Sequence, residues 1–399
     1  MSADASGTGP ATQTQLSCNW SPGNFKIIKH IPKSARASCA THLSSLLRSV
    51  VSNPASVNNW LGLFNWAGSI LQPAKRGGKR HNLSTTLRNR ISSFAASATP
   101  ENLTDSRFAK TRQATTESML CQAVTAKLEE GNMRAAIRLL MSDDTPASPS
   151  VESLAKLQDK HPSASLDPVD LPPPSQAGCL LVDENEVRRA VLSFPSGSAG
   201  GPDGLRPQHI RDMLLCREAG SDFLTALTAF VNLVLAGGCP ADFAPVFFGG
   251  RLLALKKKSG GIRPIAVGFT LRRLVSKCAN ASGITELKAF FHPSQPGGCE
   301  AAIHSARRYL ESMPHNHVVV KLDFSNAFNS LHRSDMLLAI QTRIPALYAY
   351  CHSAYSQPSV LYHGPYTLLS QEGPQQVGRF FIVTGLNRAV PSRSFLPTG

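Results

Sequence analysis

The sequence lacks acidic residues over most of its first hundred positions. No Asp or Glu occurs between Asp4 and Glu101, although the chain of 399 residues holds 26 acidic residues against 41 Lys and Arg. This stretch contains eleven cations: Lys26, Lys29, Lys33, Arg36, Arg48, Lys75, Arg76, Lys79, Arg80, Arg88 and Arg90. Because a field of one sign attracts polyanions, the segment predicts contact with nucleic acid, either RNA or DNA. A solvated basic arm without a specific ligand is the alternative.

The sequence also lacks the motifs typical of zinc-binding, disulfide-bonded, secreted and membrane-spanning proteins. Its nine cysteines form no Cys-x-x-Cys pair and have no histidines at zinc-finger spacing, which argues against a zinc site or disulfide framework. No charged start precedes an apolar segment at the N-terminus, and the most apolar run, Phe223–Ala236, is shorter than the roughly 20 residues that cross a bilayer. We therefore expect an intracellular protein of the nucleus or cytoplasm, neither secreted nor in a membrane, and leave its oligomeric state open.

Composition and apolar spacing divide the chain into segments. Residues 1–24 are rich in Ser, Thr and Gly, which predicts disorder. Residues 25–100 form a basic N-terminal region with apolar side chains at helical spacing, and residues 101–160 predict a helical pair that breaks at Gly131. Residues 161–182 are proline-rich, which predicts a stiff linker and a domain boundary.

Local signals after the linker predict regular elements. Asp183 and Glu186 have the spacing of a capping box at the start of a helix, and a second helix begins near Ser221. The apolar runs Leu252–Leu255 and Ile262–Val267 lie on either side of a Ser-Gly-Gly turn, which predicts a β-hairpin.

Further along, helical patterns flank a β-branched run. The helices are predicted over Cys299–Met313 and Arg333–Ile344, and the segment His317–Phe324 between them predicts a buried strand that ends in Asp323. A second hairpin is predicted over 360–369.

Two groups of residues suggest chemistry on their own. A carboxylate such as Asp323 at the end of an apolar strand is costly to bury unless it is paired or binds a metal; a helix cap or an ion-pair partner is the alternative.

The first predicted hairpin carries Lys256, Lys257 and Lys258 on one arm and Arg263 on the other. These cations can clamp a triphosphate, or the lysines can simply keep an edge hairpin soluble.

A third group is the run from Lys75 to His81, which reads Lys-Arg-Gly-Gly-Lys-Arg-His. Its two glycines let the backbone bend while Lys75, Arg76, Lys79 and Arg80 stay close together. The run could lie along a phosphate backbone or act as a nuclear-import signal, and its length does not separate the two.

The order of five motifs resembles the reverse transcriptase domain of non-long-terminal-repeat retrotransposon proteins. In order along the chain, the motifs are AGGPDGLRPQHI at 199–210, LLALKKKSGGIRPIAVGFTLRRLVSK at 252–277, PGGCEAA at 296–302, VVVKLDFSNAFNSL at 318–331 and LSQEGPQQ at 369–376. The resemblance covers about 183–376. It implies an α+β architecture in which a basic, mostly helical N-terminal region precedes partial fingers and the start of the palm of a right-hand polymerase.

The resemblance also implies roles for single residues. Asp323 matches the first metal-binding aspartate of the palm, with the carbonyl of Phe324 beside it, and Phe328 matches the side chain that excludes a ribose 2′-hydroxyl. Arg263 matches the fingers arginine that holds a deoxynucleotide triphosphate, with Lys257 or Lys258 as its companion, and Gln376 matches the segment near the template base and nucleotide sugar. The implied reaction is RNA-directed DNA synthesis, a nucleotidyl transfer with two Mg²⁺ as cofactors.

The chain departs from the family pattern in two places. A glycine-rich piece is missing before Pro296, and residues 377–399 form a non-matching tail without Asp or Glu, so further metal carboxylates cannot come from the tail. We therefore expect a truncated or degenerate retrotransposon copy that is inactive alone. A non-catalytic nucleic-acid-binding protein that acts through residues 25–100 is the alternative, and an interaction protein built on the helices near 116–141 is a third hypothesis.

Overall fold

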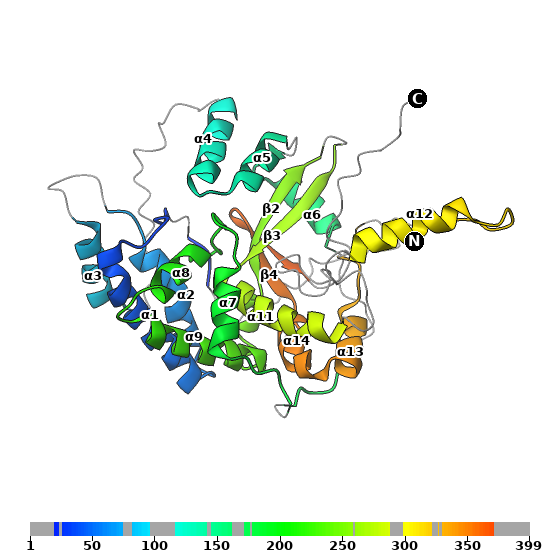
Figure 1. Ribbon diagram of the computed structural model, residues 1–399. Coiled ribbons are helices and arrows are strands. Elements are labelled where there is room, and N and C mark those ends of the chain that lie inside the picture. Colours follow the sequence, from blue (N-terminus) through cyan, green and yellow to red (C-terminus); the bar gives the residue numbers. More distant parts are fainter. Residues whose placement is uncertain are drawn as a thin grey trace, which may run out of the picture.

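The computed structural model describes residues 20–23, 26–74, 82–95, 116–141, 145–161, 171–175, 178–257, 260–287, 298–320, 326 and 329–370. Over these residues the chain is a mixed α and β protein. A helical body lies beside a small sheet, and a hairpin of two helices lies near the free end of that sheet (Figure 1). No helix in the described part of the chain is both long and apolar enough to cross a membrane.

The helices and strands follow one another in this order. The first half holds α1 (Arg36–Ser52), α2 (Val57–Ile70), α3 (Leu83–Ser92), α4 (Thr116–Glu129), α5 (Met133–Met141), β1 (Thr145–Pro146), α6 (Val151–Asp159) and α7 (Glu184–Leu192). The second half holds α8 (Pro207–Leu214), α9 (Gly220–Leu235), α10 (Ala244–Phe247), β2 (Gly250–Lys256), β3 (Ile262–Gly268), α11 (Thr270–Leu287), α12 (Gly298–Glu311), α13 (Arg333–Arg343), α14 (Tyr348–Tyr355), β4 (Ser359–His363) and β5 (Tyr366–Ser370).

The basic N-terminal region and the later helices share one hydrophobic core. Helix α1 packs along α9, and α2 inserts Trp60 between the rings of Phe230, Phe243 and Phe247, at centroid distances of 5.4 to 5.6 Å. Trp60 is fully buried. Large aromatic side chains gain most from leaving water, so this cluster holds the two parts of the sequence together.

The described part of the predicted linker is also bound to the body. Val182 and Asn232 of α9 exchange two hydrogen bonds, at 2.9 and 3.0 Å. Further back, Tyr348 donates its hydroxyl to the carbonyl of Pro172 at 2.7 Å. The proline-rich segment therefore connects two regions that belong to one core.

Trp20 lies in the segment that composition predicts to be disordered, yet its indole packs on the core. Its ring is 5.4 Å from Phe269 and 5.8 Å from Tyr362, and its Nε1 donates to Asn65 at 3.0 Å. A single large aromatic residue can be anchored in this way although the average composition around it is polar. Residues 1–19 lie outside the described part.

The sheet is built around β2. Strand β3 pairs antiparallel with the whole of β2, while the other edge of β2 carries β1 near its end and β4, in parallel, near its start. Strand β5 completes a hairpin with β4. Leu157 of α6 covers one face of the sheet, in a small core with Leu252, Ala254 and Leu361.

Several elements predicted from local signals are confirmed. Asp183 accepts the N–H of Glu186 at 2.7 Å, and Glu186 accepts the N–H of Asp183 at 2.9 Å, so α7 begins with a full capping box. The predicted helical pair breaks at Gly131, which has a φ of 69°. Both predicted hairpins form, as β2–β3 and β4–β5.

The prediction of a buried strand over His317–Phe324 is wrong for the part that the structure describes. Residues 317–320 lie in no strand, and Val318, Val319 and Val320 are exposed by 84%, 59% and 71%. A β-branched run is stable as a strand only when another strand pairs with its backbone and covers its side chains. No described strand lies beside this run.

Candidate nucleotide-binding site on the β2–β3 hairpin

The two predicted nucleotide-binding residues that the structure describes lie together at the tip of the β2–β3 hairpin. Arg263 pairs in register with Leu255, two positions before Lys257, and the N–H of Lys257 donates to the carbonyl of Gly261 at 2.7 Å to close the turn. Both side chains are exposed. The turn uses Gly260 with a φ of 83°, a conformation that glycine adopts without strain.

The hairpin has one covered face and one open face. Leu252, Ala254 and Ile262 are buried against α6, whereas Arg251, Leu253 and Arg263 are exposed on the opposite face. This alternation follows from the period of two along a strand. Arg263 therefore lies on the open face.

Lys256 belongs to the covered side of the hairpin. Its register partner is the buried Ile262, and α6 carries Glu152 on this side. The pKa of Glu152 is lowered first by a hydrogen bond from Lys156, and the charge of Lys256 adds to the lowering. Lys256 thus points toward α6, away from the face that holds Arg263.

At the base of the hairpin the motif Gly-Gly-Pro-Asp-Gly forms a tightly held loop. Arg273 of α11 donates to the carbonyl of Ala199 at 2.7 Å, and the hydroxyl of Thr270 donates to the carbonyl of Leu205. A Cβ added to Gly201 would lie 2.6 Å from the Cα of Phe269, so only glycine allows this approach.

The loop buries a carboxyl group beside two arginines. Asp203 is 3% exposed, and burial raises the pKa of its carboxyl to about 7, against the opposing effects of the Leu205 N–H and the charges of Arg251 and Arg273. No role for Asp203 is predicted from the sequence, where it is one residue of the motif at 199–210. Its environment depends on residues about 50 and 70 positions away, which no local pattern reveals.

A buried arginine fixes the start of β2. Arg272 of α11 donates Nη1 to the carbonyls of Phe248 and Gly249, directly before the strand, and its guanidinium lies 5.7 Å from the centre of the Phe248 ring. Its Nε has no hydrogen-bond partner. The helix α11 therefore positions both the Asp203 loop and the hairpin.

The predicted metal-binding residues Asp323 and Phe324 lie outside the described residues, as do Phe328, Gln376 and Lys258. Among the described residues nearby, the side-chain amides of Asn326 and Asn329 both donate to the carbonyl of Lys160, at 3.1 and 2.8 Å. Within the described ranges, no three His, Cys, Asp or Glu side chains form a group that could hold a metal ion.

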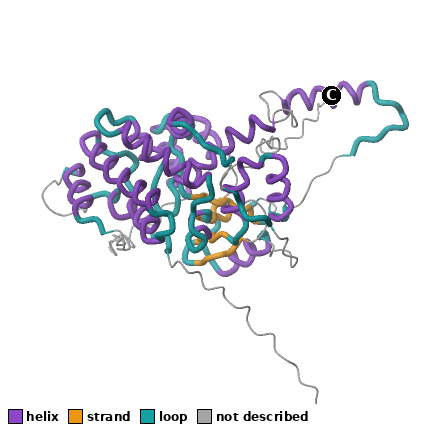
Figure 2. Tube along the Cα trace, turned by 90° about the horizontal axis from the view of Figure 1, so that it is seen from below, coloured by secondary structure: helices purple, strands orange, loops and turns teal. Residues whose placement is uncertain are grey.

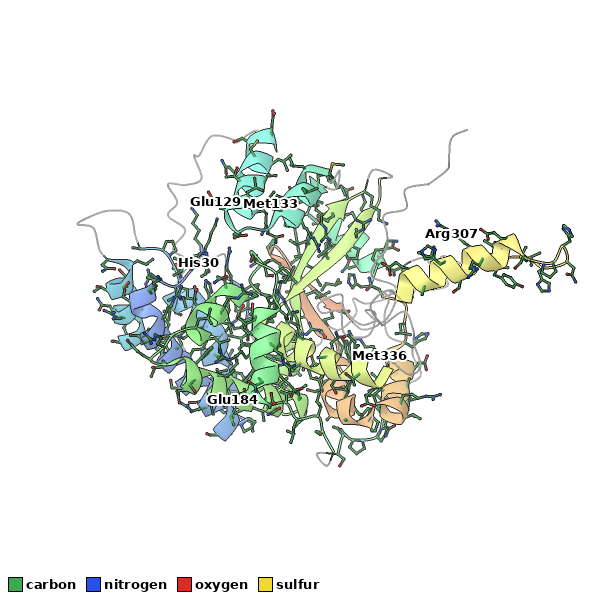
Figure 3. The ribbon with its side chains drawn as sticks, in the orientation of Figure 1. His30, Glu129, Met133, Glu184, Arg307 and Met336 are labelled. Carbon is green, nitrogen blue, oxygen red and sulfur yellow. The ribbon has the colours of Figure 1, made fainter. Side chains whose placement is uncertain are left out.

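The predicted basic cluster of Lys75, Arg76, Lys79 and Arg80 also lies outside the described residues. Other cations of the N-terminal region are used within the fold. Arg36, Arg48 and Lys29 form ion pairs with Asp212, Asp222 and Glu129, and Arg88 and Arg90 donate to backbone carbonyls. Figure 3 shows Glu129 at the end of α4, beside Met133.

No family model matches this chain, and no curated protein matches it.

Proposed function

We propose that this chain is a reverse transcriptase-like retroelement protein whose β2–β3 hairpin binds the triphosphate of a deoxynucleotide. One observation carries the proposal: Lys257 and Arg263 lie at the exposed tip of a hairpin whose base is held by α11. Arg263 offers a planar fork of donors for phosphate oxygens, and Lys257 adds a point charge. The motif order supports the nucleotide as the ligand.

The test is equilibrium binding of a fluorescent deoxynucleotide triphosphate to the full chain in MgCl₂. We expect Arg263→Gln to weaken binding roughly tenfold or more, because a charge-assisted contact to phosphate is lost. Lys257→Gln acts in the same direction. Lys256→Gln is the matched control, since it removes the same charge from the opposite face. Equal losses in Arg263→Gln and Lys256→Gln would show that only overall charge attracts the nucleotide.

We also propose that these 399 residues do not extend a primer by themselves. Asp323 is the single palm aspartate among the matched motifs. One carboxylate would leave most of the positive charge of two divalent ions without a protein ligand to balance it. Primer extension on an RNA template with the purified chain tests this. Deoxynucleotide incorporation that disappears in Asp323→Ala would overturn it.

The second candidate function is nucleic-acid binding without chemistry, through the N-terminal region. Because five of its described cations form ion pairs or donate to backbone carbonyls within the fold, we assign this function to Lys75, Arg76, Lys79 and Arg80. Replacing all four with Ala is expected to weaken RNA or DNA binding and to flatten its dependence on log[salt]. An unchanged salt slope would exclude this cluster as the binding surface.

A further inference from the structure

Helix α12 and the residues up to 320 extend away from the body of the molecule. Figures 1 and 2 show the extension from two directions, and Arg307 marks it in Figure 3. Every side chain from Glu300 to Glu311 is exposed. A helix of 14 residues is marginal in water unless it packs against something, so α12 needs a partner that the described part of the chain does not supply.

The exposed helix carries an apolar stripe. Ile303, Ala306 and Leu310 recur at spacings of three and four residues, and Met313 continues the series beyond the helix. Ile303 and Leu310 are 46% and 49% exposed. This is the spacing of a two-stranded coiled-coil seam, which buries such side chains against a second helix.

The two flanks of the stripe complement each other when two copies run antiparallel. One flank carries Glu300 and Arg307, seven residues apart, and the other carries Ala302 and Tyr309. When Ile303 of one helix packs beside Ala306 of an antiparallel copy, Glu300 faces Arg307 of the partner subunit. On the other flank, the same alignment places the small Ala302 opposite Tyr309 of the partner subunit.

A parallel pairing lacks this match. In that arrangement the flank with Arg307 faces the flank with Ala302, and Glu300 gains no opposite charge. The alignment of charge and size therefore favours one orientation, and it is self-complementary as a two-fold interface requires.

We propose that α12 is a dimerisation helix that pairs antiparallel with α12 of a second copy of this chain. The proposal does not rest on nucleotide binding. Its test is sedimentation equilibrium of the full chain over a range of concentrations. We expect a reversible monomer–dimer equilibrium that Leu310→Glu or Ile303→Glu shifts to monomer. Glu117→Arg, on the exposed side of α4, is the control for a change of charge elsewhere.

Charge reversal tests the orientation. Glu300→Arg alone and Arg307→Glu alone each place like charges opposite each other twice in the dimer, and we expect each to weaken dimerisation roughly tenfold. The double variant Glu300→Arg with Arg307→Glu restores the opposite charges and is expected to recover wild-type dimerisation. Circular dichroism checks that all variants fold alike.

Three results would overturn the proposal. The wild-type chain could be monomeric at every concentration, or its dimer could survive Leu310→Glu, and in either case α12 is not the interface. A double charge reversal that dimerises no better than the single variants would exclude the antiparallel alignment, and would point to another partner for the stripe.

Discussion

Asp212 of α8 accepts a hydrogen bond from Nη2 of Arg36 at 2.8 Å, across 176 positions of sequence. Its second oxygen accepts the N–H of Ile31, also at 2.8 Å. Asp212 is almost fully buried, so these hydrogen bonds replace the water that its carboxylate loses on folding. One carboxylate from α8 thus fixes the start of the basic N-terminal region.

Asp212→Ala is expected to lower the free energy of unfolding by about 3 kcal/mol, because Nη2 of Arg36 and the N–H of Ile31 both lose their acceptor. Urea denaturation measures the loss. The control is Asp222→Ala, which breaks the ion pair with Arg48 where both side chains are about half exposed; there we expect less than about 1 kcal/mol. Similar losses at the two sites would mean that burial of Asp212 has no consequence.

The raised pKa of Asp203 predicts a pH dependence of stability. Its usual value is 3.8 and its folded value about 7, so the folded chain holds a proton that the unfolded chain has lost. The stabilisation is complete below pH 3.8 and is lost as the pH rises through 7, by at most about 4 kcal/mol.

Asp203→Asn removes this titration. The difference in unfolding free energy, variant minus wild type, is expected to rise by several kcal/mol between pH 4 and pH 8. Denaturation at a series of pH values measures it, with Asp335→Asn on the exposed side of α13 as control. A difference that stays constant with pH would contradict the buried protonated carboxyl.

His209 predicts the opposite trend. Its Nδ1 accepts the N–H of Arg206 and its Nε2 donates to the carbonyl of Ile28 at 2.8 Å, so the ring is neutral. Burial lowers the pKa of His209 from 6.5 to about 4. Its stabilisation is present above pH 6.5 and is lost as the pH falls through 4, by at most about 3 kcal/mol.

His209→Gln removes the acid-induced loss at this position, so the variant is expected to gain stability relative to wild type as the pH falls from 6.5 to 4. The same denaturation series provides the measurement. Between these values the effects of His209 and Asp203 nearly cancel in the wild type, so only the single variants separate them. An equal acid response in His209→Gln and wild type would show that His209 is not the group being protonated.

Gly201→Ala is expected to destabilise the protein by roughly 2 to 3 kcal/mol, because its Cβ would meet backbone atoms of Phe269 and Thr270. Thermal or urea unfolding tests this. Gly261→Ala is the matched control, since the nearest atom to its Cβ is 3.8 Å away on the flexible Lys257 side chain. We expect that control to lie within about 1 kcal/mol of wild type.

Local signals in the sequence alone determined many of the elements. The capping box of Asp183 and Glu186, the turn at Gly260 and the break at Gly131 depend on residues within a few positions of each other, and each forms as predicted. The open face of the hairpin was partly predictable too, because alternation along β2 and β3 places Arg263 opposite the apolar face.

Only the tertiary structure decided which charges are paired and which apolar side chains are buried. Charge composition predicted a basic region without acids, but Asp212, Asp222 and Glu129 come from far along the chain to pair with its cations. The valines at 318–320 were predicted to be buried, yet in the described structure no strand covers them. The local sequence sets the preferred backbone conformation. Burial and charge pairing, in contrast, depend on contacts with residues far away in the sequence, and only the folded chain brings these residues together.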